Sequence, residues 1–425
     1  MRTDERPERD RSSRDTGWLI ALSVLVVVIG MAYTLWWPPV VRHHPYWTIP
    51  GDIWYTVRTA HWIGWGSLSY VYSNDRSALV TLPGFELLLT PVVMLGSALH
   101  LSEVAPGLIG PLRPTEWLLV GPLTMASVAL PLFAFDALAR RLDITTRRRR
   151  LLAAAEAAAL WSTVALWGHP EDVLALGLAV YALLMMIDRR WAPAGWLLGA
   201  ALAMQLLVVM LVPLLVGLVG WRKASSVLAR AVVLPGFLLV VVLVPDYHAA
   251  VWVLANQPSV PAVNHATPWL ALAPSLHNGQ LVSGGLGRLL NVVVALGAGV
   301  LAARWRTDLW RIVWLAATVL AARSVFEAVM VPYYVVPGIA LALVSGCRHS
   351  LRWLATCLAG AGLTVMVFTQ HGRWEYWGML TALVLLVQAL AWPMPRTAPI
   401  SRFREAEERA ARGGAGDRDL QGVPA

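Results

Sequence analysis

A five-residue turn between two apolar stretches of this chain holds three ionisable side chains. It reads Gly168-His169-Pro170-Glu171-Asp172. Charge in or beside apolar segments of membrane length is costly and usually functional. One interpretation is that the two acids cap the following helix, where the helix dipole favours anions. The other is that the turn binds a hydroxyl group of an acceptor substrate, or a cation, and the two interpretations are compatible.

A second candidate for chemistry is Asp52, a lone carboxylate in the aromatic segment Gly51-Asp52-Ile53-Trp54-Tyr55. Apolar surroundings favour the protonated form of a carboxyl group, which suits a general base that takes a proton from a sugar hydroxyl. The alternative is structural, because aspartate is a common N-cap before an amphipathic helix. The residues alone leave both interpretations open.

Arg323 and Glu327 lie four residues apart in an apolar stretch, which predicts that they share one helix face. They form either a structural ion pair or a site where Arg323 meets an anionic head group, for which a guanidinium is well suited. Tyr333 and Tyr334 follow at the end of this stretch. These two rings belong either to an interfacial aromatic belt or to a lipid-phosphate site.

The long polar segment 246–285 contains His265 and Trp269 together with several amide side chains. Aromatic faces stack on sugar rings and amides hydrogen-bond to hydroxyl groups, so this composition suits sugar recognition. The alternative is a belt of interfacial tryptophans.

Membrane-spanning helices have to position these residues. Of the 425 residues, 57% are hydrophobic and 14% are charged, against about 25% charged residues in soluble proteins. The apolar runs are roughly 20 residues long and lack the alternation of barrel strands. The sequence therefore predicts an all-α, polytopic transmembrane bundle with about 11–13 membrane segments.

Basic residues gather at the ends of the apolar runs, most densely between 140 and 150. This is the positive-inside pattern, and it does not resemble a nucleic-acid-binding patch. Placing the basic ends in the cytoplasm puts 38–80, the 168–172 turn, 246–285 and 370–376 outside. The candidate residues then converge on the extracytoplasmic side of a cell membrane. One or two interfacial helices are expected in the first outer loop, 38–80.

Two apolar runs are irregular. The run 80–101 contains prolines, and either it dips into the membrane and returns or the segment 102–115 makes a short crossing. The run 194–220 has basic residues on both flanks, which predicts two short helices packed as a hairpin. Broken helices at membrane depth are tolerated only where they are buried in protein or line a cavity.

The ends of the chain are polar. We expect a disordered cytoplasmic N-terminus over 1–16, one transmembrane domain over 17–393, and a disordered cytoplasmic tail over 394–425. The two cysteines, Cys347 and Cys357, have no spacing typical of a disulfide framework or a structural metal site. The sequence contains no Walker motif, which argues against ATP as the driving ligand.

Taken together, these features resemble the GT-C superfamily of integral-membrane glycosyltransferases. Within it, the chain resembles the bacterial polyprenyl-phosphate-mannose-dependent α-mannosyltransferases of glycosyltransferase family 87. The resemblance rests on an acidic residue in the first outer loop, on a glycine-led outer turn, and on a late Tyr-Tyr-x-x-Pro. These are Asp52, with Gly66–Tyr70 and a proline-marked run over 82–91 behind it, the turn 168–172, and residues 333–337.

The chain departs from the family pattern in three places. Leu82-Pro83-Gly84 stands where the family usually has Tyr-Pro-Pro, and Gln205 stands near a position that is often lysine. The family more often has Gly-Gln at the outer turn.

The resemblance implies a GT-C-type bundle that moves a hexose, with mannose the first expectation, from a polyprenyl-phosphate donor to a lipid-linked or glycan hydroxyl. Transfer would take place outside the cytoplasm and invert the anomeric configuration. Asp52 would be the base. The leaving phosphate would be held by Arg58 or Arg323, with Tyr333 and Tyr334 beside it.

By the same resemblance, His169, Glu171 and Asp172 would position the acceptor, and His265 and Trp269 would contribute from the covering loop. We expect no cofactor and no divalent metal, because such a donor carries a single phosphate. The expected partners are the donor, the acceptor and membrane lipids, with no nucleic acid.

Two other classes of protein fit the residues. A lipid or small-solute transporter also has broken helices and paired intramembrane charges, although the sequence shows no clear internal repeat. A non-catalytic membrane protein of envelope assembly is the other alternative.

Overall fold

The computed structural model describes residues 16–36, 50, 52–73, 79–101, 114–261, 265–276, 279–368 and 373–393. The two predicted disordered ends, 1–16 and 394–425, lie outside these residues apart from Thr16. Residues up to Trp392 belong to one compact unit, and every element below lies in that unit.

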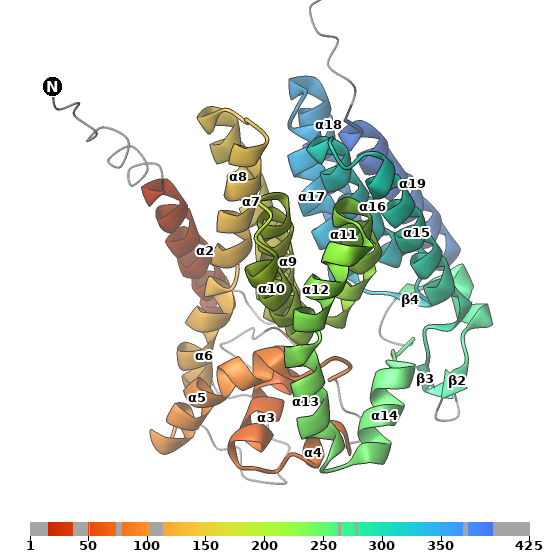
Figure 1. Ribbon diagram of the computed structural model, residues 1–425. Helices are drawn as coiled ribbons and strands as arrows, with labels where there is room; N and C mark the ends of the chain where they lie inside the picture. The colour runs from red at the N-terminus through yellow and green to blue at the C-terminus, as the bar shows by residue number, and fades with distance from the viewer. Residues whose placement is uncertain are drawn as a thin grey trace, which may run out of the picture. The chain divides into compact units, whose positions relative to one another are not determined.

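Helices account for most of the described residues (Figure 1). In chain order they are α2 (Gly17–Trp36), α3 (Ile53–Gly64), α4 (Tyr70–Ser73), α5 (Gly84–Ala98), α6 (Pro114–Ala126), α7 (Ala129–Arg141), α8 (Thr146–Ala165), α9 (Pro170–Ile187), α10 (Trp191–Met204), α11 (Val212–Val219), α12 (Trp221–Ala231), α13 (Val233–Leu243), α14 (Tyr247–Asn256), α15 (Gly285–Arg304), α16 (Leu309–Phe326), α17 (Val336–Gly346), α18 (Ser350–Phe368) and α19 (Arg373–Ala391).

Short 3₁₀ segments and strands fill some of the connections. The 3₁₀ segments are Leu206–Leu211, Pro268–Leu272 and Pro332–Val335, and the strands are β1 (His265–Ala266), β2 (Ser275–Leu276), β3 (Leu281–Val282) and β4 (Val329–Met330). Strand β1 pairs antiparallel with β4, and β2 pairs antiparallel with β3.

Six helical stretches among the described residues are long and apolar enough to cross a membrane. They are Gly17–Thr34, Thr115–Arg141, Pro170–Ile187, Trp221–Leu243, Gly285–Arg304 and Leu309–Phe326, and five shorter apolar helices accompany them. The predicted all-α, multi-pass membrane protein is confirmed at this level. The expected count of about 11–13 membrane segments stays a prediction.

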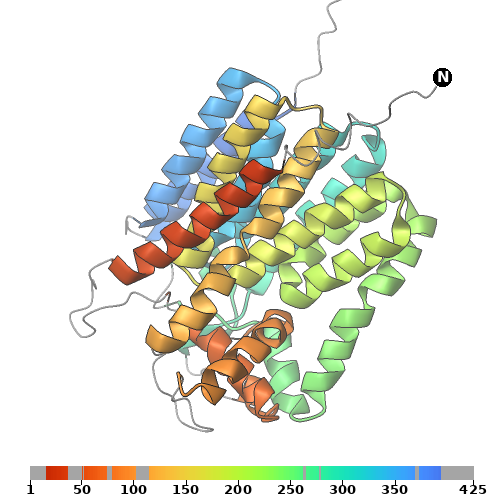
Figure 2. The ribbon, with the colours of Figure 1, turned by 90° about the vertical axis from the view of Figure 1, so that its left-hand side faces the viewer.

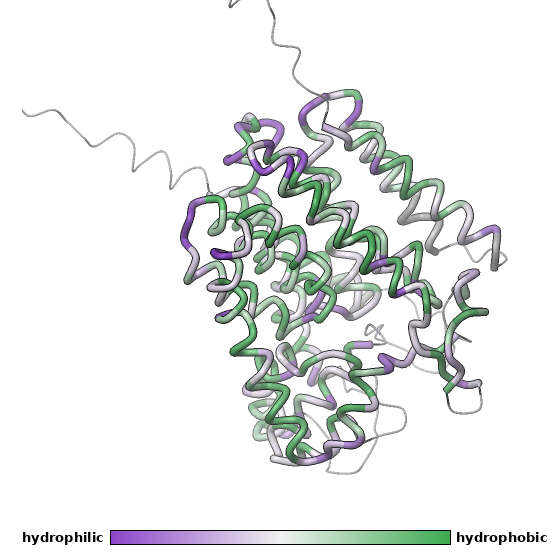
Figure 3. The backbone as a smooth tube through the Cα atoms, turned by 45° about the vertical axis from the view of Figure 1, so that its right-hand side comes forward, coloured by the Kyte–Doolittle hydropathy of each residue, from purple (hydrophilic) through white to green (hydrophobic). Residues whose placement is uncertain are grey.

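The outer faces of several helices carry exposed apolar side chains, as lipid-facing helices do. On α2, Ile20, Val24 and Val28 recur every four residues and are all exposed. Figure 3 shows apolar residues along most of the helical tube, with polar residues at its turns. Because residues four apart lie on one helix face, these side chains form a continuous apolar stripe.

The basic turns lie at one end of the bundle, the upper end in Figure 1. The α7–α8, α15–α16 and α17–α18 connections all lie there, whereas α3, α14 and the strands lie at the opposite end. Figure 2 shows α2 crossing the outside of the bundle, where it packs on α6 and α8. The arginine-rich turns and the candidate residues near α3 are therefore at opposite ends, as the positive-inside pattern predicts.

The length of helix α5 bears on whether the apolar run 80–101 crosses the membrane. It has 15 residues and is about 22 Å long, short of the roughly 30 Å that a span must cross. It packs along α3. This length favours the alternative in which the run dips in and returns; the segment 102–113 lies outside the described residues. Helices α3 and α4 fill the place of the one or two expected in the first outer loop.

The run 194–220 is broken, as predicted, but its two halves are not a hairpin. Helix α10 packs on α9 and α12, whereas α11 packs on α15. The hairpin was wrong because α11 and α15 approach very closely where Gly217 meets the backbone of Gly299. The helix stops at Gln205, whose backbone is extended, with φ −150° and ψ 118°.

Candidate active site

The turn before α9 brings two distant parts of the chain together. Gly168 has a φ of +77°, a conformation that glycine adopts without strain. A β-carbon at Gly168 would lie 2.6 Å from the backbone nitrogen of Ile53. The turn is therefore pressed against the first residues of α3, and only a glycine fits there. This contact sets His169 beside Asp52, 117 positions away in sequence.

His169 joins two carboxylates. Its Nε2 lies 2.9 Å from Asp52 Oδ2, and its Nδ1 lies 2.6 Å from Glu171 Oε1. Ionised carboxylates only accept hydrogen bonds, so a ring that donates to both must be the imidazolium. Burial opposes this charge, but the charge of Glu171 and the hydrogen bonds to Asp52 and Glu171 outweigh it and raise the pKa of His169 to about 10.

Asp52 is at the N-cap position of α3, but its side chain does not cap the helix. The carboxylate turns to His169 instead, and it stays 48% exposed. Asp52 therefore has the N-cap position that the structural interpretation expects, but its carboxylate does not cap the helix. A carboxylate that is anchored through one oxygen and half open to its surroundings is a group that a substrate can reach.

One tyrosine stacks on the histidine, and a second tyrosine packs on the first. The ring of His169 stacks on Tyr333, with centroids 3.8 Å apart and planes 28° from parallel. Tyr334 lies edge-on to Tyr333, at 5.1 Å between centroids, and the guanidinium of Arg323 lies over Tyr334 at 3.5 Å. Both predicted tyrosines thus belong to the cluster around His169 and do not lie in an exposed belt.

Arg323 forms an ion pair with Glu327, which is one of the two interpretations that the sequence left open. Its Nε lies 3.7 Å from Glu327 Oε1, and the other oxygen of Glu327 lies 3.3 Å from Nε of Arg288. Glu327 comes just after α16 ends and has extended backbone, so the two residues do not share a helix face as predicted. Arg288 is a further partner of Glu327 that no pattern in the sequence indicated.

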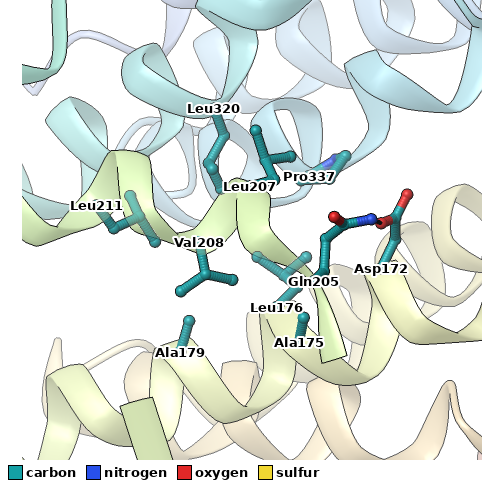
Figure 4. A pocket seen from close by; sticks show the side chains of 10 residues that line it. All are labelled: Asp172, Ala175, Leu176, Ala179, Gln205, Leu207, Val208, Leu211, Leu320 and Pro337. Atoms are coloured by element: carbon teal, nitrogen blue, oxygen red, sulfur yellow. Dashed lines mark hydrogen bonds between the residues drawn. The ribbon is translucent and has the colours of Figure 1, made fainter. Parts of the chain in front are cut away.

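Asp172 contacts Gln205 at the break between α10 and α11. The amide of Gln205 donates a hydrogen bond to Asp172 Oδ1. Beside this pair lies a small cavity of about 20 Å³. Figure 4 shows Asp172 and Gln205 together at one end, with Val208 and Leu211 along the apolar remainder. The cavity therefore has one polar end, and Gln205 is a site residue that sequence reasoning used only for the family comparison.

The loop 246–285 is fixed to the chain that follows α16. Residues 265 and 266 pair with 330 and 329, and the Thr267 hydroxyl donates to the backbone oxygen of Glu327 at 2.6 Å. The indole N–H of Trp269 donates to the Val325 oxygen at 2.9 Å. Trp269 thus anchors the loop, and its sugar contact stays a prediction, as does any role of His265, whose side chain lies outside the described structure.

Glu86 and Arg58 are two further ionisable residues of this part of the structure. Glu86, at the start of α5, is buried and lies within electrostatic range of Glu171 and His169; nothing in its sequence context pointed to this. Among the described residues, Arg58 makes no hydrogen bond or ion pair with the His169 cluster, and its guanidinium lies among aromatic rings of α3.

In the described part of the chain, no group of three or more His, Cys, Asp and Glu side chains could hold a metal ion. The expectation that no metal or cofactor is needed stays a prediction.

The predicted residues Asp52, His169, Glu171, Tyr333, Tyr334 and Arg323 therefore form one connected cluster, with Asp172 next to it. No protein-family model matches the chain, and no curated protein matches it.

Proposed function

We propose that the protein is a GT-C-type membrane glycosyltransferase. It transfers a hexose from a polyprenyl-phosphate donor to a hydroxyl group of a lipid-linked or glycan acceptor on the extracytoplasmic side. The observation that carries the proposal is the arrangement of Asp52, His169 and Glu171, in which one imidazolium bridges two carboxylates. It lies at the end of the bundle opposite the arginine-rich turns.

Asp52 is the base. One of its oxygens is held by His169, which leaves Oδ1 to accept the proton of the acceptor hydroxyl. As that proton moves to Asp52, the hydroxyl oxygen bonds to the anomeric carbon, and the bond from this carbon to the phosphate oxygen breaks. Its electron pair leaves with the phosphate. A single displacement of this kind inverts the anomeric configuration.

Glu171 positions the acceptor. Its Oε1 is occupied by His169, but its Oε2 is buried without a hydrogen-bond partner. A buried polar atom without a partner costs about 1–3 kcal/mol. A second hydroxyl of the acceptor would satisfy this oxygen and align the first hydroxyl with Asp52.

The leaving phosphate needs a cation nearby, because charge that develops on a leaving group is best stabilised by preorganised donors. Arg323 and Arg58 are the two candidates.

The test is the variant Asp52→Asn, which keeps the size of the side chain and removes its basicity. Transfer from a polyprenyl-phosphate hexose in membranes should fall by about 10²–10⁴-fold, with the protein still present at its normal amount. Asp246→Asn is the matched control, since Asp246 caps α14 through its side chain and asparagine caps equally well. Transfer that survives in Asp52→Asn rejects the proposal.

One observation favours a transporter as a second candidate. A helix broken at Gln205 beside a cavity is typical of transporters. The two functions differ in purified protein, because a transferase still forms glycosylated product in detergent, where no compartments exist.

A further inference from the structure

Three polar side chains from three different helices are hydrogen-bonded in a row. Ser97 Oγ lies 3.4 Å from His61 Nδ1, and His61 Nε2 lies 2.6 Å from Glu116 Oε1. The histidine is 36 residues from the serine and 55 residues from the glutamate. None of the three takes part in the proposed glycosyl transfer, so this arrangement needs an explanation of its own.

The row is assembled where three helices meet. His61 lies in the last turn of α3, Ser97 in the last turn of α5, and Glu116 in the first turn of α6. Helix α5 packs on both α3 and α6, and all three lie at the end of the bundle opposite the arginine-rich turns (Figure 1). The ring of His61 also stacks on Trp65, with 4.9 Å between centroids, which fixes its orientation.

The contact with Glu116 decides which ring nitrogen of His61 carries the proton. An ionised carboxylate only accepts hydrogen bonds, so Nε2 donates to Glu116 and Nδ1 of the neutral ring keeps its lone pair. The hydroxyl of Ser97 donates to that lone pair. The order hydroxyl, imidazole, carboxylate is the arrangement that activates a serine as a nucleophile.

Burial strengthens the coupling between His61 and Glu116. Both side chains are completely buried, and Glu116 Oε2 has no hydrogen-bond partner in the described part of the chain. A buried carboxylate stabilises an imidazolium beside it because charges are weakly screened there. His61 is therefore placed to take the proton of Ser97 as the serine attacks, with Glu116 stabilising the charge that forms.

The serine is the accessible end of the row. Ser97 is partly exposed, and Leu95 and Leu99, in the same turn of the chain, are exposed. Exposed apolar side chains at this point favour contact with lipid chains, so the substrate that fits has an aliphatic part. The distance of 3.4 Å between Ser97 and His61 is long, as contacts between a nucleophile and its base often are before substrate binds.

We propose that Ser97, His61 and Glu116 form a second catalytic site, which hydrolyses a carboxylic ester of a lipid. Ser97 is the nucleophile and His61 is the general base. Glu116 holds the ring in the required tautomer. This activity is separate from glycosyl transfer and does not depend on Asp52.

The reaction has two steps. Ser97 Oγ bonds to the carbonyl carbon as its proton moves to His61 Nδ1, the bond from this carbon to the ester oxygen breaks, and the alcohol leaves with that proton. The acyl group is then on Ser97. In the second step a water oxygen bonds to the acyl carbon and gives a proton to His61, the bond to Ser97 Oγ breaks, and the proton returns to Ser97 as the fatty acid leaves.

The first experiment uses an alkyl fluorophosphonate, which has an aliphatic chain and reacts with activated serines. Ser97 Oγ bonds to phosphorus, fluoride leaves, and His61 takes the proton. The purified full-length chain is treated in detergent, and peptide mass spectrometry gives the labelled position and the rate. The variants are Ser97→Ala, His61→Gln and Glu116→Gln. Ser225→Ala is the matched control, because Ser225 is exposed and donates to a backbone oxygen.

Wild type and Ser225→Ala should carry the label at Ser97, and Ser97→Ala should not be labelled there. His61→Gln should react about 10²-fold more slowly or less, which is the usual contribution of a general base. Glu116→Gln keeps the shape of the side chain and loses its charge, so labelling should slow by about tenfold or more.

The second experiment measures ester hydrolysis directly. The dodecanoyl ester of p-nitrophenol should be hydrolysed faster than the butanoyl ester, because its chain can lie along the leucines of α5. Ser97→Ala should hydrolyse neither ester above the uncatalysed rate. Equal rates for the two esters in wild type would overturn the lipid part of the proposal.

The catalytic site itself is overturned if wild type is not labelled at Ser97, or if His61→Gln is labelled as fast as wild type. Should His61→Gln or Glu116→Gln fail to fold, Ser97→Ala decides, because it removes one hydroxyl and leaves the buried pair of His61 and Glu116 in place. Hydrolysis that persists in Ser97→Ala rejects the site. The three side chains then serve only to hold α3, α5 and α6 together.

Discussion

The two ends of the bundle use the same kind of contact to opposite effect. At the arginine-rich end, Asp136 accepts hydrogen bonds from Arg140 at 2.7 Å and from Arg149 at 3.1 and 3.2 Å. At the other end, Asp52 and Glu171 each bind His169 through one oxygen only. The side chain of Asp136 is 2% exposed, and that of Asp52 is 48% exposed.

The difference is in what each carboxylate leaves unsatisfied. Both oxygens of Asp136 are used, and its two partners join the end of α7 to the start of α8. We call this a closed contact, because both carboxylate oxygens are already bonded. Such a contact holds helices together and leaves no acceptor for a ligand. The buried and unpaired Oε2 of Glu171 makes a functional site the better interpretation of the second cluster, since protein structures rarely leave buried acceptors unpaired.

The largest effect should come from breaking the closed contact. Asp136→Asn leaves Arg149 buried beside a neutral partner, and removal of one member of a buried pair costs about 3–5 kcal/mol. The free energy of unfolding in detergent should fall by that amount, whereas Asp52→Asn should cost less than about 1 kcal/mol. Asp143→Asn, in the exposed turn after α7, is the control. Equal losses for Asp136→Asn and Asp52→Asn would erase the distinction between the two ends.

The open cluster should be the pH-sensitive one. The pKa of His169 in the folded protein, about 10, is above the ordinary value near 6.5, so the folded state binds the proton more tightly. This contribution to stability is complete below about pH 6.5, declines as pH rises, and is lost above about pH 10. Unfolding temperatures from pH 6 to 11 should fall less steeply in His169→Gln than in wild type. Parallel curves would show that His169 is not the group that titrates.

The smallest predicted effect tests whether Trp269 does more than anchor the loop 246–285. Trp269→Phe keeps an aromatic face and loses the hydrogen bond to the Val325 oxygen, so stability should fall by about 0.5–1.5 kcal/mol. If the ring also stacks on a sugar, the acceptor KM should stay near the wild-type value in Trp269→Phe and rise in Trp269→Ala. A rise in neither variant would leave Trp269 with the anchoring role alone.

Charge in an apolar context was enough to find the four ionisable residues among the six of the cluster. Asp52, His169 and Glu171 stand out in the sequence because ionisable residues are expensive beside membrane-length helices. The same criterion passes over Gln205, which has no charge, and it did not single out Arg288. Glu86 lies in a proline-rich run whose path the sequence leaves open.

The contacts themselves were beyond the sequence because they depend on how closely backbones approach. His169 meets Asp52 because Gly168 packs on Ile53, and α11 leaves α10 for α15 because Gly217 and Gly299 adjoin. A glycine in a sequence shows that a close approach is allowed, but it does not name the partner.

The stacking of His169 on Tyr333 has a consequence for biogenesis. A membrane protein is inserted as it is translated, and the groups of this cluster come from the first outer loop, the middle of the chain and the segment after α16. A nascent chain that has already placed Asp52 beside the histidine still lacks Tyr333, Tyr334 and Arg323. The cluster is therefore complete only once the segment after α16 has been made.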